Sequence, residues 1–260
     1  MGSILKTFIT PHPPILIPEI GKGEENKAES TIASFRKAAK KIAGLKPSTI
    51  LLTTPHAPLF RDFIYINIKP VLDGSMKRFG AANVRLQFDN NLQLAEKIIK
   101  TANSQGILCG GLDSLLASRY KISDELDHGA MIPLYFIAQE YSDFKLVHIS
   151  TSGLPFKELY RFGCCIADAV EHSDENVVFV ASGDLSHRLA PDGPYGFNEC
   201  GPEFDGQLVD YLKIPDPEGL LKFDEGFLEE AGECGLRSFI IMFGALDGCR
   251  IRSQVYSYEG

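Results

Sequence analysis

Two of the six histidines in this chain stand in nearly the same short context. The stretch "TPHPPIL" (10–16) contains His12, "TPHAPL" (54–59) contains His56, and each stretch follows an apolar run. Prolines beside a histidine restrict its backbone, so each imidazole is presented with little conformational freedom. A side chain that is already in place loses less entropy on binding, and imidazole is the commonest metal ligand. We therefore predict that His12 and His56 share a metal site.

A second motif adds an acid and a base. "SGDLSH" (182–187) places Asp184 and His187 three residues apart, which on a helical turn would put both on one side. Asp184 would then orient His187, or cap a short helix, or do both. His128, in "DELDHGAMIPL", stands at an expected junction of a loop and a helix. The two other histidines, His148 inside a strand and His172 near a helix end, are expected to be structural.

A third motif, "EEAGECGLRS" (229–238), precedes an apolar segment that we expect to be a buried helix. The N-terminus of a helix favours a carboxylate or a thiolate, so Glu233 or Cys234 could be a ligand, while helix capping is an equal alternative. Two imidazoles with one anionic group form the ligand set of non-haem Fe(II) oxygenases, and zinc hydrolases use similar ligands. The ligand types alone leave iron and zinc open.

The elements that must position these residues follow from hydrophobic patterning. Apolar β-branched runs alternate with longer helical patterns, which favours one α/β domain, residues 1–260, with a central, mostly parallel sheet covered by helices on both faces. We predict strands at 5–10, 49–54, 63–68, 106–110, 145–151, 176–183 and 250–260, helices at 23–45, 90–106, 155–172 and 235–248, and a loop at 190–204. His12, His56 and His187 each follow a predicted strand, and in such sheets sites form at the carboxyl ends of strands.

Composition restricts the partners and the location. The formal net charge of −8 does not attract nucleic acid or an anionic membrane. The sequence has no run of 18 apolar residues and no signal-peptide pattern at its start, so we expect a cytoplasmic protein. Its six cysteines form no CxxC pair, as expected for reduced thiols.

The joint order of five motifs resembles the LigB-like class III extradiol ring-cleavage dioxygenases and their relatives, the Memo proteins. These motifs are "TPHPP", "TPHAP", "LDHGAMIPL", "SGDLSH" and "EAGECGLR…GAL", and they span residues 10 to about 246. The chain looks most similar to the bacterial LigB-like domain that is often fused to, or encoded with, an AMMECR1 domain and a radical-SAM protein. The resemblance therefore implies an AMMECR1-domain or radical-SAM protein as a partner, and association into a homo-oligomer.

The resemblance also implies a ligand set. In the dioxygenases, Fe(II) is held by the histidines that match His12 and His56 and by a glutamate near the start of a late helix. Glu233 lies in the matching region, whereas Memo proteins have a cysteine followed by glycine at a point that falls on Cys234. The third ligand is therefore Glu233 or Cys234, with Glu230 as a more distant alternative.

The remaining roles are carried over in the same way. His187 matches the catalytic base, His128 matches the acid, and Asp184 supports them. The implied reaction is cleavage of a catechol or aminophenol-like ring with O₂. Two alternatives use the same scaffold: a Memo-like metal-linked or redox-linked binding protein that does not cleave rings, and a zinc-dependent hydrolase or lyase.

Overall fold

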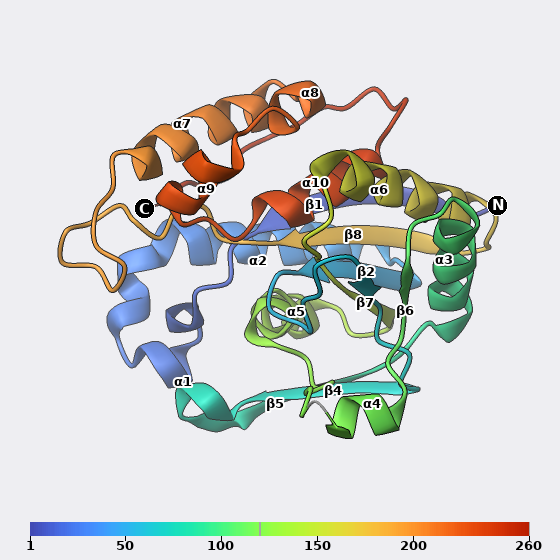
Figure 1. Ribbon diagram of the computed structural model, residues 1–260. Coiled ribbons are helices and arrows are strands. Elements are labelled where there is room, and N and C mark those ends of the chain that lie inside the picture. Colours follow the sequence, from blue (N-terminus) through green and yellow to red (C-terminus); the bar gives the residue numbers. More distant parts are fainter. Residues whose placement is uncertain (120, 260) are drawn as a thin grey trace.

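A four-stranded parallel sheet forms the centre of the protein, as seen in the computed structural model, which describes residues 1–119 and 121–259 (Figure 1). The strand order is β1-β8-β2-β7, so β1 is an edge strand and β8 and β2 are central. The strands are β1 (Ser3–Thr10), β2 (Thr49–Thr54), β7 (Lys145–Ser150) and β8 (Asn176–Ser182). The four strands predicted at these positions are confirmed to within two residues of their ends.

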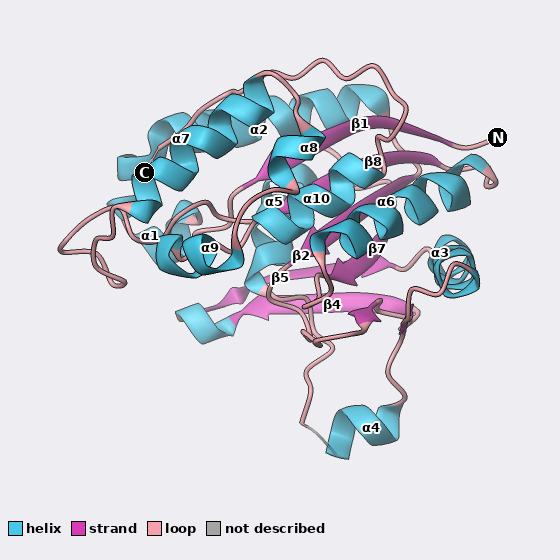
Figure 2. Ribbon diagram, turned by 45° about the horizontal axis from the view of Figure 1, so that its top comes forward, coloured by secondary structure: helices cyan, strands magenta, loops and turns pink. Residues whose placement is uncertain are grey.

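Helices cover both faces of this sheet (Figure 2). One face carries α3 (Leu92–Ser104), α6 (Phe156–Glu171) and α10 (Leu236–Gly244), and the other carries α2 (Glu29–Leu45) and α5 (His128–Glu140). Alternate residues of β2 enter the two apolar cores, Leu51 on the α6 side and Ile50 and Leu52 on the α2 side. The predicted fold class, an α/β sheet covered by helices on both faces, is confirmed.

A two-stranded antiparallel sheet that the sequence did not predict lies below α5 in Figure 1. It consists of β4 (Val71–Met76) and β5 (Ala81–Asp89), joined by the 3-10 helix η3 (Lys77–Phe79). The predicted strands at 63–68 and 106–110 are reduced to the two-residue strands β3 (Ile64–Tyr65) and β6 (Cys109–Gly110). The remaining elements are η1 (Pro14–Leu16), α1 (Pro18–Gly21), η2 (Glu24–Ala28), α4 (Ser114–Arg119), α7 (Cys200–Lys213), α8 (Pro217–Leu220) and α9 (Glu225–Ala231).

The predicted final strand is wrong. Residues 250–259 form no strand, and residue 260 lies outside the described part. Side chains attach this segment instead, because Glu259 accepts hydrogen bonds from Thr31 of α2 and the Tyr258 hydroxyl donates to Asp205 of α7 at 2.7 Å. Among the described residues, no helix combines the length and the apolar character needed to cross a membrane.

The parallel sheet gathers the sequence motifs at one edge. Because all four strands point the same way, their carboxyl ends lie together, and the loops after β1, β2 and β8 start there. These loops carry His12, His56 and the segment with Asp184 and His187, while α5 begins at His128. The fold therefore places four of the six histidines around the same end of the sheet.

Candidate metal centre

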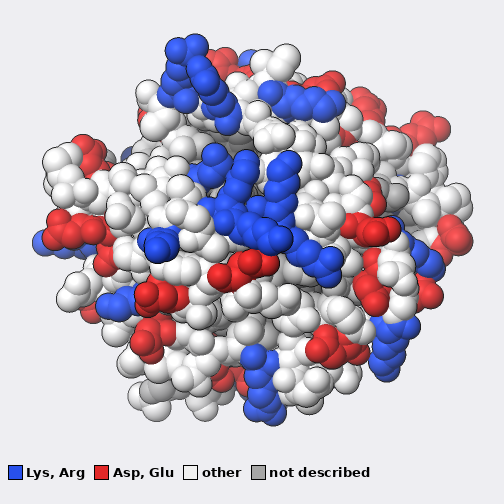
Figure 3. Space-filling model, turned by 180° about the vertical axis from the view of Figure 1, so that it is seen from behind, with Lys and Arg blue, Asp and Glu red and all other residues white. Residues whose placement is uncertain are grey.

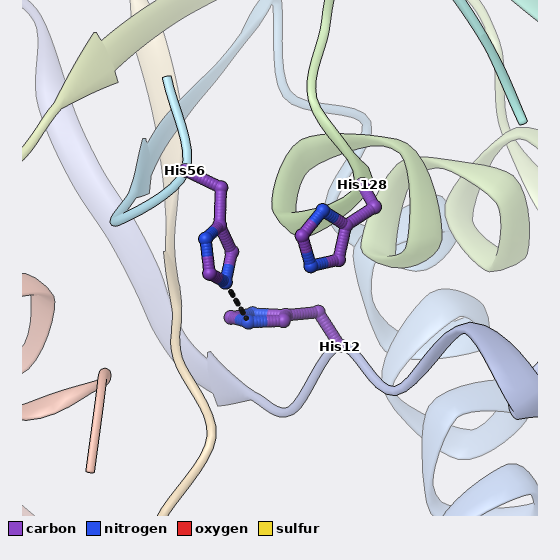
Figure 4. Close-up of side chains that lie close together, drawn as sticks. All are labelled: His12, His56 and His128. Atoms are coloured by element: carbon purple, nitrogen blue, oxygen red, sulfur yellow. Dashed lines mark hydrogen bonds between the residues drawn. The ribbon is translucent and has the colours of Figure 1, made fainter. Parts of the chain in front are cut away.

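Three imidazole rings converge at the carboxyl ends of β1 and β2 and the start of α5 (Figure 4). The Nε2 atoms of His12 and His56 are 3.0 Å apart. The ring of His128 stacks on that of His56, with centroids 4.1 Å apart, and meets the His12 ring edge-on. His12 is 1% exposed, His128 is half-buried and His56 is exposed, so the group opens to solvent on the side of His56.

His12 is held in one tautomer by its neighbours. The hydroxyl of Ser182 donates to the carbonyl oxygen of Gly129 at 2.5 Å, so its oxygen must accept from Nδ1–H of His12 at 2.9 Å. Nε2 of His12 is therefore the nitrogen with the free lone pair. Burial, only partly offset by the charge of Asp184, lowers the pKa of His12 to about 4. The ring is neutral at pH 7, as a metal ligand must be.

Two further ligand atoms face the same nitrogen. Sγ of Cys234 lies 3.6 Å and Oδ2 of Asp184 lies 3.7 Å from Nε2 of His12. Two overlapping groups of potential ligand atoms therefore share His12, one with His56 and His128 and one with Asp184 and Cys234, each within 4.8 Å. Ligand atoms about 2.1–2.3 Å from one ion lie roughly 3–4 Å from each other, so these side chains fit a shared transition metal.

The three candidates for the third ligand make different contacts. The Glu233 carboxylate accepts a hydrogen bond from the backbone N–H of Leu236 at 2.7 Å, in the first turn of α10. Cys234 turns towards His12 instead. Glu230 lies near the surface, where it accepts from Asn198 at 2.6 Å. Of the three, Cys234 alone joins either described group of potential ligands.

The protonation of Cys234 depends on what it faces. Burial raises the pKa of its thiol well above the usual value, and burial also raises the pKa of the Glu233 carboxyl. Without a cation the thiol of Cys234 is therefore favoured in its neutral form. Only the thiolate is a strong metal ligand, and a bound cation lowers the pKa of a coordinating thiol. Cys234 thus fits a ligand that loses its proton when the metal binds.

His187 belongs to a different local environment. Its Nδ1 donates to the carbonyl oxygen of Gly232 at 2.5 Å, and its Nε2 lies 3.6 Å from Oδ2 of Asp184. The hydrogen bond to Asp184 raises the pKa of His187. Burial opposes ionisation of Asp184, but the contacts with His187 and His12 outweigh it and lower the pKa of that carboxyl. The expected helical turn is absent here, yet Asp184 and His187 still meet.

Two glycines bring Asp184 and Cys234 together. A Cβ on Gly183 would lie 2.1 Å from the Cα of Gly235, so the loop after β8 and the loop before α10 touch through their backbones. Next to this contact, the backbone N–H of Asp184 donates to Sγ of Cys234 at 3.3 Å. Any side chain at Gly183 would separate the two loops and move both potential ligands.

Sequence reasoning missed the group that connects β2 to α5. Asp127 accepts hydrogen bonds from the Thr54 hydroxyl at 2.7 Å and from the first turn of α5, and lies 3.1 Å from Nε2 of His148. Burial opposes its ionisation, but the bonds from His148 and Thr54 hold the pKa of Asp127 far below its usual range. The only available signal was an aspartate just before an expected helix start, which is typical of an N-cap.

Comparison with known proteins shows the family of this chain. Residues 6–260 match the family described as "Catalytic LigB subunit of aromatic ring-opening dioxygenase". This chain belongs to the LigB family. The resemblance to LigB-like proteins is thereby confirmed.

Curated relatives of this LigB chain are similar over nearly its whole length. Protein CA_C1420 of Clostridium acetobutylicum is 44% identical over 97% of the chain, which spans 54%, about half, of that protein. The 2-aminophenol 1,6-dioxygenase beta subunit of a Pseudomonas species is 22% identical, over 99% of this chain and 90% of its own. The 3,4-dihydroxyphenylacetate 2,3-dioxygenase of Escherichia coli is 24% identical, over 99% and 95%.

A solved structure shares the fold. The uncharacterized protein JW3007 from Escherichia coli K12 superposes with a TM-score of 0.57 and 17% sequence identity, covering 82% of each chain. At this identity the likeness concerns the fold alone.

Proposed function

We propose that this LigB protein is a metal-dependent extradiol-type dioxygenase that cleaves a catechol or aminophenol-like ring with O₂, and that its metal is Fe(II). The observation that carries the proposal is the buried lone pair of His12 Nε2, which faces His56, Cys234 and Asp184. The two relatives named as dioxygenases, which this chain covers over 90% and 95% of their lengths, support the same reaction class.

His12, His56 and Cys234 would hold the metal, with the Asp184 carboxylate beside them. Fe(II) held there would act as a Lewis acid that lowers the pKa of a ring hydroxyl. The protein keeps one side of the ligand group dry, because His12 is fully buried, and leaves the side of His56 open. A ring therefore approaches from the side of His56 and His128.

His187 is suited to take the proton of the ring hydroxyl. Its Nδ1–H is fixed by Gly232, so Nε2 is the nitrogen that gains a proton, and Asp184 stabilises the imidazolium that results. His128 is suited to the opposite task. Burial lowers its pKa, so a proton that reaches this imidazole is readily given up again. The two histidines thus differ in the direction in which each favours proton transfer.

Two aromatic side chains border the space next to these histidines. The ring of Phe79 lies 5.2 Å from that of His128, and the ring of Tyr195 lies 5.2 Å from that of His187, measured between centroids. Such rings offer faces for an aromatic substrate to pack on and help to exclude water.

The test is a turnover assay under defined metal conditions. The protein is purified without oxygen, loaded with Fe(II), mixed with a panel of catechols and 2-aminophenols and then exposed to O₂. We expect a yellow ring-opened product and O₂ uptake with at least one substrate, and no product from His187→Ala. His172→Ala is the matched control, because this histidine is 70% exposed and lies near a helix end. Product formation that is independent of iron would contradict the proposal.

One observation favours a second function. The atom facing His12 is the thiol of Cys234, whereas the Glu233 carboxylate caps α10. Thiolate ligands favour softer metals than carboxylates do, which suits a metal-linked or redox-linked binding protein without ring cleavage. Stoichiometric bound metal, with no product from any ring in the panel, would support this second function. Zinc as the bound metal in protein purified without oxygen, together with turnover that needs no O₂, would indicate a zinc hydrolase or lyase.

A further inference from the structure

A second feature of the molecule lies behind the metal centre. A partly open cavity of about 580 Å³ is lined by β1, α2, α7, α10 and the C-terminal segment, residues 250–259. Its volume is within the roughly 300–1,000 Å³ of small-molecule sites, whereas about 150 Å³ suffices for a single benzene ring. Asp184 and His187 form part of its wall. The cavity therefore touches the candidate site but has room for much more than one ring.

The C-terminal segment forms the roof of this cavity. It is attached by side chains, since Glu259 accepts from Thr31, Tyr258 donates to Asp205, and Tyr256 lies under two lysines of α2. Among the described residues, no backbone hydrogen bond joins this segment to β1. The outer edge of β1 is therefore left open beneath the roof, and the space between them is the cavity.

The length of the cavity and its two ends follow from the residues of β1 and α2 that line it. The connection of α2 to β2 is short, residues 46–48, so α2 runs opposite to the parallel strands. Lys6 and Thr10 of β1 are about 13 Å apart along the strand, and Thr31 and Lys41 of α2 about 15 Å apart along the helix. All four residues line the cavity. Lys6 and Lys41 are thus at one end, and Thr10 and Thr31 at the end near the candidate site.

The two ends carry opposite charges. Lys6, Lys41 and Arg252 line the end remote from the metal centre. Arg252 is placed there because it lies near the start of the C-terminal segment, whereas Glu259, near the end of that segment, is bonded to Thr31. Asp184 and Asp205 line the near end. Seen from behind, Lys and Arg side chains gather in the middle of the face that includes α2 (Figure 3). Between the ends the wall is mostly apolar, formed by Phe8, Phe35, Val209, Met242, Phe243 and Leu246.

The charges differ in whether they are already satisfied. At the near end, Asp184 contacts His12 and His187, and Asp205 accepts from Ser186 and Tyr258. Among the described residues, Lys6 and Arg252 have no ion-pair partner. A cationic ligand would therefore find acids that are occupied, whereas an anionic ligand would find free cations.

We propose that this cavity binds an elongated organic acid with an apolar chain, its carboxylate at Lys6 and Arg252 and its other end beside Asp184 and His187. A length of about 13–15 Å and a mostly apolar wall suit a chain of roughly ten carbons. The reverse orientation would place the carboxylate against Asp184 and Asp205, which like charges disfavour. This inference does not depend on a metal or on ring cleavage.

The charge end of the site is tested with decanoic acid, titrated into the full chain as isolated by isothermal titration calorimetry. We expect saturable 1:1 binding. Lys6→Glu and Arg252→Glu should each weaken binding about tenfold, the effect of losing one charge-assisted hydrogen bond. Lys40→Glu is the matched control, because Lys40 is exposed on α2 and is not part of the wall. The methyl ester of the probe should bind as weakly as the charge variants.

The volume of the site is tested by filling it. Ser34→Trp and Ala38→Trp place an indole in the cavity from α2 and should abolish probe binding, while Ala33→Trp, on the exposed side of α2, should not. Circular dichroism and thermal unfolding check the fold. If the buried Ala38→Trp variant does not fold, the binding result for Ser34→Trp is the decisive one. Undiminished binding in Ser34→Trp, equal binding of the ester, or no saturable binding would each overturn the proposal. These readouts need neither iron nor O₂, so they are independent of the turnover assay.

Discussion

His12 and His187 show how two environments give one residue type two chemical characters. Each histidine has its Nδ1–H fixed by an oxygen, that of Ser182 for His12 and that of Gly232 for His187, and each directs Nε2 towards Asp184. Burial dominates at His12 and lowers its pKa, whereas the bond to Asp184 dominates at His187 and raises its pKa. The buried ring is suited to hold a metal and the partly exposed ring to carry a proton.

The largest effect should follow removal of the buried ring. His12→Ala removes the lone pair shared by both groups of potential ligands. Metal affinity should therefore fall by more than about 100-fold, which exceeds the loss expected when only a residue that hydrogen-bonds to a ligand is removed. The measurement is the iron bound per chain after anaerobic loading, followed by gel filtration. Stoichiometric iron in His12→Ala, with the fold intact by circular dichroism, would remove the basis of the proposed site.

The complementary change should separate binding from turnover. His187→Ala should retain the metal, because His187 belongs to neither described ligand group, and should lower kcat by about 10²–10⁴-fold, the typical contribution of a general base. Metal content and kcat are measured on the same preparation with a substrate found in the panel. Loss of metal together with activity would show that the two histidines do not differ as inferred.

A smaller effect should follow removal of the hydroxyl that orients His12. Ser182→Ala leaves Nδ1–H of His12 without its acceptor, so metal affinity should fall about 10–100-fold while His12 remains in place. Ser238→Ala is the matched control, because Ser238 is also a buried serine but its hydroxyl has no hydrogen-bond partner. Titration with Fe(II) under argon gives both affinities. Equal losses in the two variants would point to general destabilisation.

The local parts of this architecture could be predicted from the sequence. The apolar run at 49–54 is fully buried and forms β2 over those same residues, and proline-flanked His12 and His56 stand just beyond strands. These features depend on neighbours in the chain. The strand predicted for the final segment was wrong because that prediction also used the local pattern alone, and the pattern suits a strand. Glu259 and Tyr258 instead attach the segment to α2 and α7 by side chains.

The parts that depend on distant contacts could not be predicted. Glu233 and Cys234 differ by one position at a helix start, and which of the two faces His12 follows from the contact of Gly183 with Gly235 across the molecule. The cavity behind β1 likewise joins elements from both ends of the chain. No local pattern in the sequence contains either relationship.

The smallest predicted effect concerns the two residues at that helix start. Glu233→Ala removes the acceptor for the Leu236 N–H, so the free energy of unfolding should fall by about 1 kcal/mol, as for the loss of a helix cap, with metal binding unchanged. Cys234→Ala should do the reverse, lowering metal affinity with little effect on stability, because its Sγ faces His12. Urea unfolding of metal-free protein and Fe(II) titration of both variants measure the two quantities. If Glu233→Ala loses the metal and Cys234→Ala keeps it, the carboxylate is the third ligand, and α10 must then release Glu233 when the metal binds.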